Sequence, residues 1–399
     1  MEHRRAPETA VDSVPVSSLP IRPGLEGETP YGAPELDVPA RLNVNENPYA
    51  PSPAVIADIA DAVARAASGL NRYPDRDFPA LREALADYLA VESGVRLGAE
   101  QIWAANGSNE VMLHLLQAFG GPGRSCLSFT PTYSMYPEYA RDTLTEYVTI
   151  PRRDDFSIDV EAAAAAIAER RPAVLIATSP NNPTGTALPL ADARALLEAA
   201  RGNGPTAADG SPTDCVVVID EAYAEFRRPG VPSALELLEA NPHLAVSRTM
   251  SKAFGAAGLR LGYLAASREL VDMLRVVRLP YHLSAITQAA ALAALAHRDE
   301  LMGQVASLRA ERDALVAWLR EQGLTAHESD ANFVLFGPFA DRRAIWQDLL
   351  DDGVLIRVVG PEGFLRASVG TPEEMAAFRA ALTKARGVSA AGRDTQEPA

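Results

Sequence analysis

The chain has 37 basic residues, of which only Lys252 and Lys384 are lysines. A lysine amine can form a covalent bond with a carbonyl compound, whereas the arginine guanidinium stays protonated and cannot. Lys384 lies in the polar run 383–386 near the C-terminus, which is typical of a solvated helix end. Lys252 lies in a glycine-rich, apolar stretch. We therefore take Lys252 as the candidate for a reactive amine.

Other polar motifs follow short apolar runs, where a parallel sheet places its ligands. They are N-G-S-N-E (106–110), S-P-N-N-P-T-G (179–185), D-E-A-Y (220–223) and T-M-S-K (249–252), and Arg260 lies eight residues after the last of them. Taken singly, a helix cap, a turn or a strand-end carboxylate would explain each motif. Their shared position at strand ends favours one common site.

These side chains match the chemical needs of pyridoxal phosphate. The pyridine nitrogen needs a buried carboxylate, for which Asp220 is placed, and the phenolic oxygen needs polar partners such as Asn182 and Tyr223. Tyr133 is placed to cover the ring, and Lys252 to form a Schiff base with the aldehyde. The phosphate needs backbone donors at a helix N-terminus, hydroxyls and an arginine. For this we expect Gly107, Ser108, Asn109, Thr249, Ser251 and Arg260.

Alternating helical patterns and short apolar runs must position this site, and they predict an α/β fold. Continuous apolar runs between helices indicate a parallel sheet that is covered on both faces. We expect helices over 55–67, 80–91 and 110–119, with Gly-Ser-Asn before the last one as its N-cap signal. We expect strands over 125–129, 173–178, 216–220, 244–248, 261–265, 332–336 and 364–369. The polar segment 202–214 is expected to be a surface insertion.

The same patterns divide the chain into segments. Residues 1–20 and 387–399 lack periodicity and are expected to be disordered tails. Residues 21–48 are expected to form an N-terminal arm, 49–283 a large domain that binds the cofactor, and 284–386 a smaller C-terminal α/β domain.

Composition excludes several classes of protein. The net charge of −15 argues against binding to nucleic acid or to anionic membranes. The two cysteines, Cys126 and Cys215, cannot form a disulfide framework or a zinc cluster, so we expect no metal site. The N-terminus lacks the apolar core of a secretory signal, and no stretch resembles a membrane span. We therefore expect a cytoplasmic protein.

The ordered motifs resemble those of fold-type-I aminotransferases, from about residue 30 to about residue 383. Besides the motifs above, the resemblance rests on N-x-N-E-N-P (43–48), R-Y-P-D (72–75), P-T-Y-S-M-Y (131–136), A-N-F (331–333) and F-L-R-A-S-V-G (364–370). Within that fold type, the stretch R-T-M-S-K-A-F-G-A-A-G-L-R-L-G-Y and its companions are most similar to histidinol-phosphate aminotransferases.

This resemblance implies a large domain with a parallel or mixed sheet, a small C-terminal domain, and a homodimer with a shared active site. It implies that Tyr73 reaches the cofactor phosphate of the neighbouring subunit. It assigns the acidic group of the substrate to Arg366, with help from Arg357. The pocket for the substrate side chain would be formed by Tyr31, Asn45 and Tyr281.

The reaction implied is amino transfer from L-histidinol phosphate to 2-oxoglutarate, which gives imidazole acetol phosphate and L-glutamate in histidine biosynthesis. Lys252 would hold the cofactor and then move the proton as base and acid, assisted by Asp220 and Tyr223. Three alternatives share most of these residues. They are an aromatic amino-acid (phenylalanine or tyrosine) aminotransferase, a phosphothreonine decarboxylase and a regulatory protein that merely holds pyridoxal phosphate.

Overall fold

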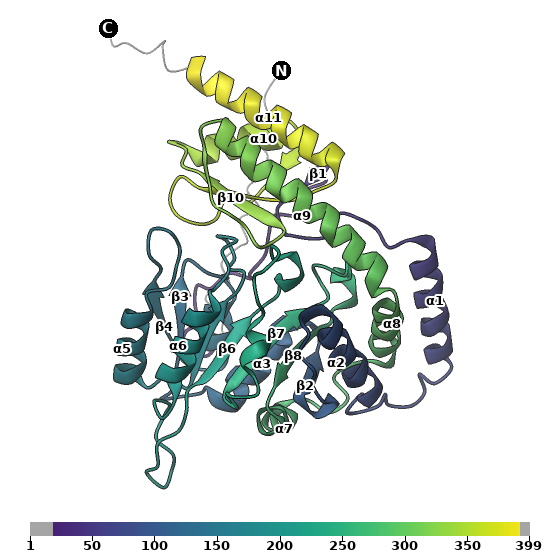
Figure 1. Ribbon diagram of the computed structural model, residues 1–399, viewed down its shortest axis with the longest axis vertical. Helices are drawn as coiled ribbons and strands as arrows, with labels where there is room; N and C mark the ends of the chain where they lie inside the picture. The colour runs from purple at the N-terminus through teal and green to yellow at the C-terminus, as the bar shows by residue number, and fades with distance from the viewer. Residues whose placement is uncertain (1–18, 392–399) are drawn as a thin grey trace.

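A seven-stranded sheet forms the centre of the protein, which we describe from a computed structural model over residues 19–391 (Figure 1). The strand order is β2-β8-β7-β6-β5-β3-β4. The strands are β2 (Ile102–Ala105), β3 (Ser125–Thr130), β4 (Glu146–Pro151), β5 (Val174–Thr178), β6 (Val216–Asp220), β7 (Leu244–Thr249) and β8 (Gly262–Ala266). The α/β class is confirmed. The sheet is mixed rather than all parallel, because β8 runs antiparallel to both β2 and β7.

Two strands of the seven-stranded sheet, β2 and β4, were not predicted from the sequence, and both lie at an edge of the sheet. β4 has only exposed and half-buried residues from Glu146 to Pro151, so it lacks the continuous buried run of a central strand. β2 is only four residues long and reads I-W-A-A, a composition that also suits a helix. Edge strands therefore carried the weaker signals.

Helices surround the sheet, and their first residues explain where several of them begin. Side-chain oxygens of Ser52, Asp159, Ser267 and Ser284 accept a backbone N–H at the starts of α1, α5, α7 and α8. The helices before the small unit are α1 (Pro53–Ala67), α2 (Pro79–Ser93), α3 (Gly107–Phe119), α4 (Tyr136–Asp142), α5 (Val160–Arg170), α6 (Leu190–Ala200), α7 (Arg268–Val277) and α8 (Ala285–Ala296). Short 3₁₀ turns lie at Ala99–Gln101, Ala224–Phe226, Ala234–Leu237 and Ala257–Leu259.

The start of α3 differs from the expectation. The helix begins at Gly107, and its N-cap residue is Asn106 rather than the Gly-Ser-Asn segment that follows it. The Glu110 carboxylate accepts hydrogen bonds from the Asn106 backbone N–H (2.6 Å) and from Asn106 Nδ2 (2.8 Å). Ser108 and Asn109 therefore lie in the first turn, where backbone N–H groups have no partner within the helix.

A second, smaller unit contains an antiparallel sheet of order β12-β10-β9 and the parallel pair β1-β11. Its strands are β1 (Ala40–Arg41), β9 (Thr325–Ala326), β10 (Phe333–Gly337), β11 (Val354–Leu355) and β12 (Leu365–Ser368), and its helices are α10 (Arg342–Asp351) and α11 (Pro372–Ala391). The N-terminal arm supplies β1, which pairs with β11, so the arm is hydrogen-bonded to the C-terminal unit.

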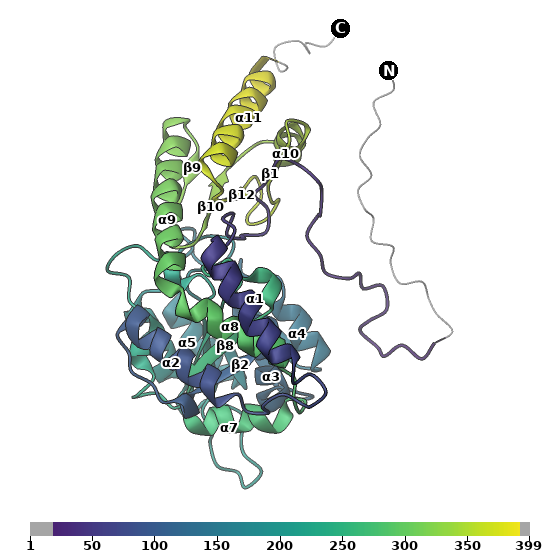
Figure 2. The same cartoon turned by 90° about the vertical axis from the view of Figure 1, so that its right-hand side faces the viewer.

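The helix α9 (Arg298–Glu321) joins the two hydrophobic cores (Figure 1). Leu301 and Val305 near its start belong to the core of the large sheet, whereas Leu315 and Leu319 belong to the core of the small unit. α8 lies beside α1 and also packs into the larger core (Figures 1 and 2). The domain limits given above stay predictions, and the packing of α8 favours a limit later than residue 284.

Residues 1–18 and 392–399, most of the two predicted tails, lie outside the described residues, whereas α11 extends to Ala391. The segment 202–214 is a loop whose base is closed by a hydrogen bond from Gly204 N to Thr213 O (2.7 Å). Within the described part of the chain, no helix is both long enough and apolar enough to span a membrane.

Candidate active site

A cavity of about 620 Å³ lies at the carboxyl ends of β3, β5, β6 and β7, between the large sheet, the N-terminal arm and the small unit. Most of the predicted site residues line it. They are Tyr31, Asn45, Ser108, Asn109, Tyr133, Asn182, Asp220, Tyr223, Thr249, Ser251, Lys252, Arg260, Arg357 and Arg366. Gly107, Tyr73 and Tyr281 are the predicted residues that do not line it.

Lys252 places its amine in this cavity, three residues after the end of β7. Its Nζ donates a hydrogen bond to the backbone oxygen of Val44 in the N-terminal arm (2.9 Å). Burial, and after it the nearby Arg366 cation, lowers the pKa of the Lys252 amine to about 8. A larger fraction of the amine is therefore neutral and nucleophilic near neutral pH than for an ordinary lysine.

Asp220 ends β6 and is 5% exposed. Its Oδ2 accepts a hydrogen bond from the Tyr136 hydroxyl (2.8 Å), and its Oδ1 accepts one from the Ala222 backbone N–H (3.1 Å). Burial nevertheless raises the pKa of the Asp220 carboxyl to about 6. Among the described residues, no cationic side chain donates a hydrogen bond to this carboxylate. A ligand with a cationic N–H group could supply that missing donor.

Tyr223 and Asn182 belong to one hydrogen-bonded network on the cavity wall. The Tyr223 hydroxyl accepts from Asn45 Nδ2 (3.0 Å) and, less closely, from Asn182 Nδ2 (3.5 Å). Asn182 Oδ1 accepts from Arg366 Nη1 (2.5 Å), and the Asn45 side chain accepts from the Ser368 hydroxyl (2.9 Å). The network joins the arm, the large sheet and β12 around the cavity.

A second part of the wall offers donors to an anion. The first turn of α3 contributes Ser108 and Asn109, and Arg260 lies beside it. A Cβ atom at Gly107 would come within 2.6 Å of Arg260 Nη2, so glycine makes room for the guanidinium. A Cβ at Gly262 would clash with the backbone of Ser108, so this second glycine lets β8 approach the helix N-terminus.

Two hydroxyl groups extend this donor set, one from the last residue of β7 and one from the loop after it. Thr249 Oγ1 donates to Ser251 Oγ (3.1 Å), and both residues line the cavity. A helix N-terminus, hydroxyls and a guanidinium together make a favourable phosphate site.

Arg366 and Arg357 lie side by side on the wall from the small unit, because their backbones pair through two hydrogen bonds of 3.0 Å. Arg366 Nη2 donates to the backbone oxygen of Asn43 (2.7 Å), and its guanidinium lies over the Phe333 ring. Burial lowers the pKa of the Arg366 guanidinium to about 10. Arg366 Nε and Arg357 Nη1 are buried and have no hydrogen-bond partner among the described residues. The pair therefore retains donors for an anionic ligand.

Tyr73 and Tyr281 lie outside this cavity and stack on each other, with ring centroids 4.5 Å apart. Tyr73 is 80% exposed and Tyr281 is 40% exposed. Neither residue reaches the cavity of its own chain.

Sequence reasoning gave no role to several groups at this site. Tyr136, which holds Asp220, was quoted within P-T-Y-S-M-Y but not assigned. The signal was its place three residues after Tyr133, on the same strand-to-helix connection. Asn43 and Val44 were also missed, since they act through backbone oxygens, which leave no trace in residue type.

The residues of the cavity fit pyridoxal phosphate. A buried carboxylate without a cationic partner, a lysine of lowered pKa and a cradle of anion donors meet the needs of the pyridine nitrogen, the aldehyde and the phosphate in turn. The unpartnered nitrogens of Arg366 and Arg357 are left over for a second anion, that of a substrate.

Comparison with known proteins agrees with this fit. The family model "Aminotransferase class I and II" matches residues 39–382. The chain therefore belongs to the class I and II aminotransferases, which are transaminases that depend on pyridoxal phosphate. The expectations of an enzyme, of this cofactor and of the fold are confirmed.

Within this family, the chain is similar to curated relatives and solved structures that are named histidinol-phosphate aminotransferases. The chain is 59% identical to the histidinol-phosphate aminotransferase of Thermobifida fusca over 93% of this chain and 97% of that protein, and 56% identical to that of Bifidobacterium longum over 94% and 98%. Its fold is similar to a crystal structure of the Sinorhizobium meliloti histidinol-phosphate aminotransferase in complex with pyridoxal-5'-phosphate. That pair has a TM-score of 0.76 and 26% identity over 88% of this chain and 92% of that one.

Proposed function

We propose that this enzyme transfers the amino group of L-histidinol phosphate to 2-oxoglutarate. The observation that carries the proposal is the Arg357–Arg366 pair, which keeps unpartnered guanidinium nitrogens in the same cavity as Lys252. Both substrates present an anion beside the reacting carbon, a phosphate in one and a carboxylate in the other. The names of the curated relatives at 51–59% identity support the same donor.

In this proposal, pyridoxal phosphate is held by the residues whose positions suit its parts. Its phosphate would lie against Ser108, Asn109, Thr249, Ser251 and Arg260. Asp220 would bind the protonated pyridine nitrogen, and Tyr223 and Asn182 the phenolic oxygen. When bound, the cofactor withdraws electrons from the α-carbon of the donor and so makes the proton on that carbon acidic.

Lys252 would be the base that removes this proton. A pKa of about 8 suits the role, because proton transfer near neutral pH is most effective when the pKa of the catalytic group is close to the working pH. The bond from Nζ to Val44 O keeps the amine on the cavity side of the loop. Tyr136 would assist indirectly, since its hydroxyl fixes the orientation of the Asp220 carboxylate.

The two arginines would divide the anion between them. Arg366 is held by Asn182, by the backbone of Asn43 and by the Phe333 ring, so its position is fixed before a substrate arrives. We expect it to bind the carboxylate of glutamate and the phosphate of histidinol phosphate alike. A phosphate has more oxygens to satisfy, and Arg357 would take the additional one.

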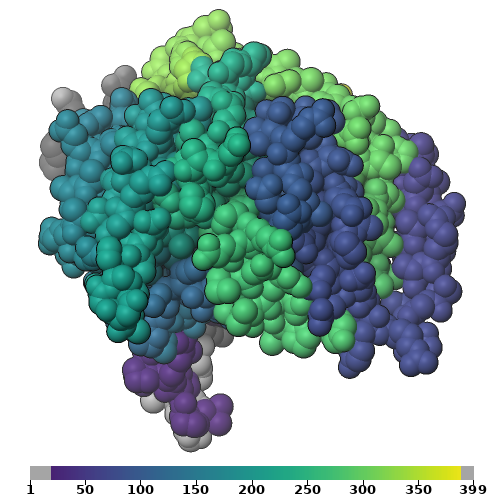
Figure 3. All heavy atoms as spheres, turned by 60° about the horizontal axis from the view of Figure 1, so that its bottom comes forward, coloured from purple at the N-terminus to yellow at the C-terminus, as the bar shows by residue number. Residues whose placement is uncertain are grey.

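We also propose a homodimer in which the partner completes the site. The Tyr73–Tyr281 stack is exposed, and so are Leu70, Val276 and Leu279, which lie within five residues of these tyrosines in the sequence. These large apolar side chains would contact water in a monomer. The N-terminal arm runs along the outside of the subunit before it reaches β1, and it contacts α4 through the Glu28–Arg141 ion pair (Figures 2 and 3). A second subunit would cover both features and bring Tyr73 to the cofactor phosphate of its neighbour.

A panel of amino donors with 2-oxoglutarate tests the substrate. Histidinol phosphate, phenylalanine, tyrosine and phosphothreonine are offered in turn, and glutamate formation and carbon dioxide release are both measured. We expect the highest kcat/KM for histidinol phosphate. Preference for phenylalanine or tyrosine, or carbon dioxide release from phosphothreonine, would refute the proposed donor.

Arg357→Ala sharpens this experiment. We expect this variant to lose roughly 10-fold in kcat/KM for histidinol phosphate and less for glutamate, because only the phosphate uses the second guanidinium. Equal losses for the two substrates would mean that Arg357 does not read the phosphate.

A further inference from the structure

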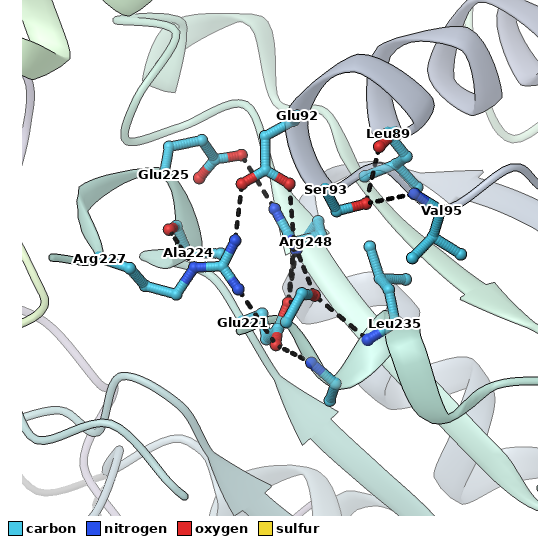
Figure 4. Close-up of polar contacts among 12 residues, drawn as sticks. Leu89, Glu92, Ser93, Val95, Glu221, Ala224, Glu225, Arg227, Leu235 and Arg248 are labelled. Carbon is cyan, nitrogen blue, oxygen red and sulfur yellow. Dashed lines mark hydrogen bonds and ion pairs between the residues drawn. The ribbon is translucent and has the colours of Figure 1, made fainter. Parts of the chain in front are cut away.

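A buried cluster of charged side chains lies behind the cavity, at the ends of β6 and β7 (Figure 4). It contains the carboxylates of Glu92, Glu221 and Glu225 and the guanidiniums of Arg227 and Arg248. The side chains of Arg248, Glu221 and Glu225 are at most 1% exposed. None of the five residues lines the cavity. The cluster is therefore separate from the groups that the proposed function uses.

Arg248 is the centre of this cluster, since it contacts all three carboxylates. Its Nε donates to Glu221 Oε2 (2.9 Å), its Nη2 to Glu92 Oε2 (3.2 Å) and its Nη1 to Glu225 Oε1 (3.4 Å). Figure 4 shows the guanidinium pointing between the carboxylates from α2, from the end of β6 and from the turn after it. A lysine could not make these divergent contacts, because its charge is concentrated on one nitrogen.

Glu221 is fixed by more partners than Arg248 alone. Its Oε2 also accepts from the Ser233 hydroxyl (2.7 Å), and its Oε1 accepts from the Ala234 backbone N–H (2.7 Å). Its own backbone N–H donates to Ser247 O on β7 (2.8 Å). Backbone and side-chain bonds at Glu221 and Arg248 thus join the carboxyl ends of the neighbouring strands β6 and β7.

The two residues are direct neighbours of the site in sequence. Glu221 follows Asp220, and Arg248 precedes Thr249, which lies three residues before Lys252. Successive side chains of an extended chain point to opposite faces. Asp220 and Thr249 therefore face the cavity while Glu221 and Arg248 face the cluster, and a displacement of either buried residue moves a cavity residue with it.

The charges of the cluster do not balance, since three carboxylates face two guanidiniums. Glu225 Oε2 and Arg227 Nη1 lack hydrogen bonds among the described residues. Burial raises the pKa of the Glu225 carboxyl, and the Glu92 carboxylate acts in the same direction, although Arg248 opposes both effects. Replacement of the Arg248 fork would leave mutually repelling carboxylates directly behind Asp220, and we expect the ends of the two strands to separate.

We propose that Arg248, bonded to Glu221, is a positioning residue that holds Asp220 and the Thr249–Lys252 segment in register with each other around the cofactor. The proposal rests on the cofactor role of Lys252 and Asp220 in the proposed function, but it does not depend on which donor the enzyme uses. It gives a role to the second residue of D-E-A-Y and to the first residue of R-T-M-S-K, which the proposed mechanism leaves unused.

The test compares Arg248→Lys with Arg312→Lys as a matched control. Arg312 is also a fully buried arginine (1% exposed), but its Nη1 donates to the backbone oxygens of Phe226 and Ala331, away from the cavity. For each variant we would measure the Tm of the apoenzyme, the Kd of pyridoxal phosphate, and the pH at which the absorbance band of the bound cofactor changes.

We expect both variants to lower the Tm, and only Arg248→Lys to change the cofactor measurements. A displaced Asp220 pairs less well with the pyridine nitrogen, so the ring withdraws electrons less strongly. The Lys252 nitrogen that is bonded to the cofactor then holds its proton more tightly. The spectral transition should therefore rise by about half a pH unit or more. The Kd of pyridoxal phosphate should rise roughly 10-fold to 100-fold.

A lowered Tm with unchanged spectral transition and unchanged Kd in Arg248→Lys would overturn the proposal, because the cluster would then be purely structural. If Arg248→Lys fails to fold, Glu221→Gln is compared with the Arg312→Lys control instead. Glutamine has the shape of the glutamate side chain but forms a weaker bond to Arg248. If folded Glu221→Gln had the spectral transition and the Kd of the wild type, the proposal would also be overturned. A wrong donor assignment would leave all three measurements as expected, so the two failures can be told apart.

Discussion

The ends of β6 and β7 have two faces, and a buried carboxylate lies on each. In the described part of the chain, the carboxylate on the cavity face has no cationic partner, whereas the one on the other face is paired with an arginine. On the cavity face, Asp220 is buried with one hydroxyl and one backbone N–H as partners, and its pKa is raised to about 6. On the other face, Glu221 is equally buried but accepts bonds from Arg248, Ser233 and Ala234. Asp220 and Glu221 are adjacent in the sequence, yet within residues 19–391 the first carboxylate has no cationic partner and the second is paired with Arg248.

The difference indicates which face is prepared for a ligand. Glu221 is paired with Arg248 within the fold, whereas Asp220, Lys252 and Arg366 keep unfavourable environments that a bound cofactor and substrate would relieve. The pKa of the Lys252 amine is lowered for the same reason that the pKa of the Asp220 carboxyl is raised, namely burial without a charged partner. Substitutions on the two faces should therefore have opposite effects on the stability of the apoenzyme.

Lys252→Ala should have the largest effect of any cavity substitution. Loss of the amine removes both the attachment point of the cofactor and the proposed base, and base catalysis alone is worth roughly 10²–10⁴-fold. We expect kcat to fall by at least about 10⁴-fold, while the circular dichroism spectrum stays that of the wild type and pyridoxal phosphate still binds non-covalently. Substantial transamination by this variant would be incompatible with the mechanism.

Arg366→Lys should have an intermediate effect. A lysine retains the positive charge but cannot bind a carboxylate or phosphate through paired hydrogen bonds. We expect kcat/KM to fall roughly 10-fold to 100-fold for both glutamate and histidinol phosphate, with little change in the Kd of pyridoxal phosphate. Half-reaction kinetics with each substrate measure this. A loss confined to one substrate would show that the two anions do not share the Arg366 subsite.

The stability of the apoenzyme gives the smallest effect and the sharpest contrast between the two faces. Because the folded state raises the pKa of Asp220 from 3.8 to about 6, it binds more protons than the unfolded state between these values, and stability falls as the pH rises through this window. Above it, the penalty amounts to about 3 kcal/mol at most. Asp220→Asn should therefore stabilise the apoenzyme at about pH 8 and lose this advantage near pH 4.

The matched substitution on the other face is Glu221→Gln, which should destabilise the apoenzyme by roughly 3 kcal/mol because it leaves Arg248 with less compensation. Urea denaturation of the two variants and the wild type measures both changes. If both substitutions shifted the free energy of unfolding in the same direction at about pH 8, the contrast between the faces would be wrong.

Much of the cavity could be predicted because its residues are polar groups at the ends of apolar runs. Asp220, Lys252 and Arg260 each follow a strand or loop whose burial is legible in the sequence, and the structure brings them together. The direction of β8 could not be predicted, since a strand buried on both faces has the same apolar pattern whether it runs parallel or antiparallel. The start of α3 was misplaced by three residues, because Asn106 was as good a cap as the residues after it.

The buried cluster had a partial signal. Adjacent Asp220 and Glu221 cannot both face the cavity, so one of them had to be buried elsewhere. Glu92 lies more than a hundred residues away on α2, and its contact with Arg248 depends on how α2 packs against the sheet, which no local pattern specifies. Long-range ion pairs of this kind follow from tertiary packing alone.

The central claim is that Lys252 holds the cofactor, and covalent labelling tests it most directly. The purified protein is treated with borohydride in the presence of pyridoxal phosphate, digested, and its peptides are mapped by mass spectrometry. The alternative amine, Lys384, is exposed and paired with Asp352 (2.5 Å), which makes it the internal control. The account predicts bleaching of the visible absorbance band and a single stable label on Lys252. A label on Lys384, or bleaching without any label on Lys252, would contradict it.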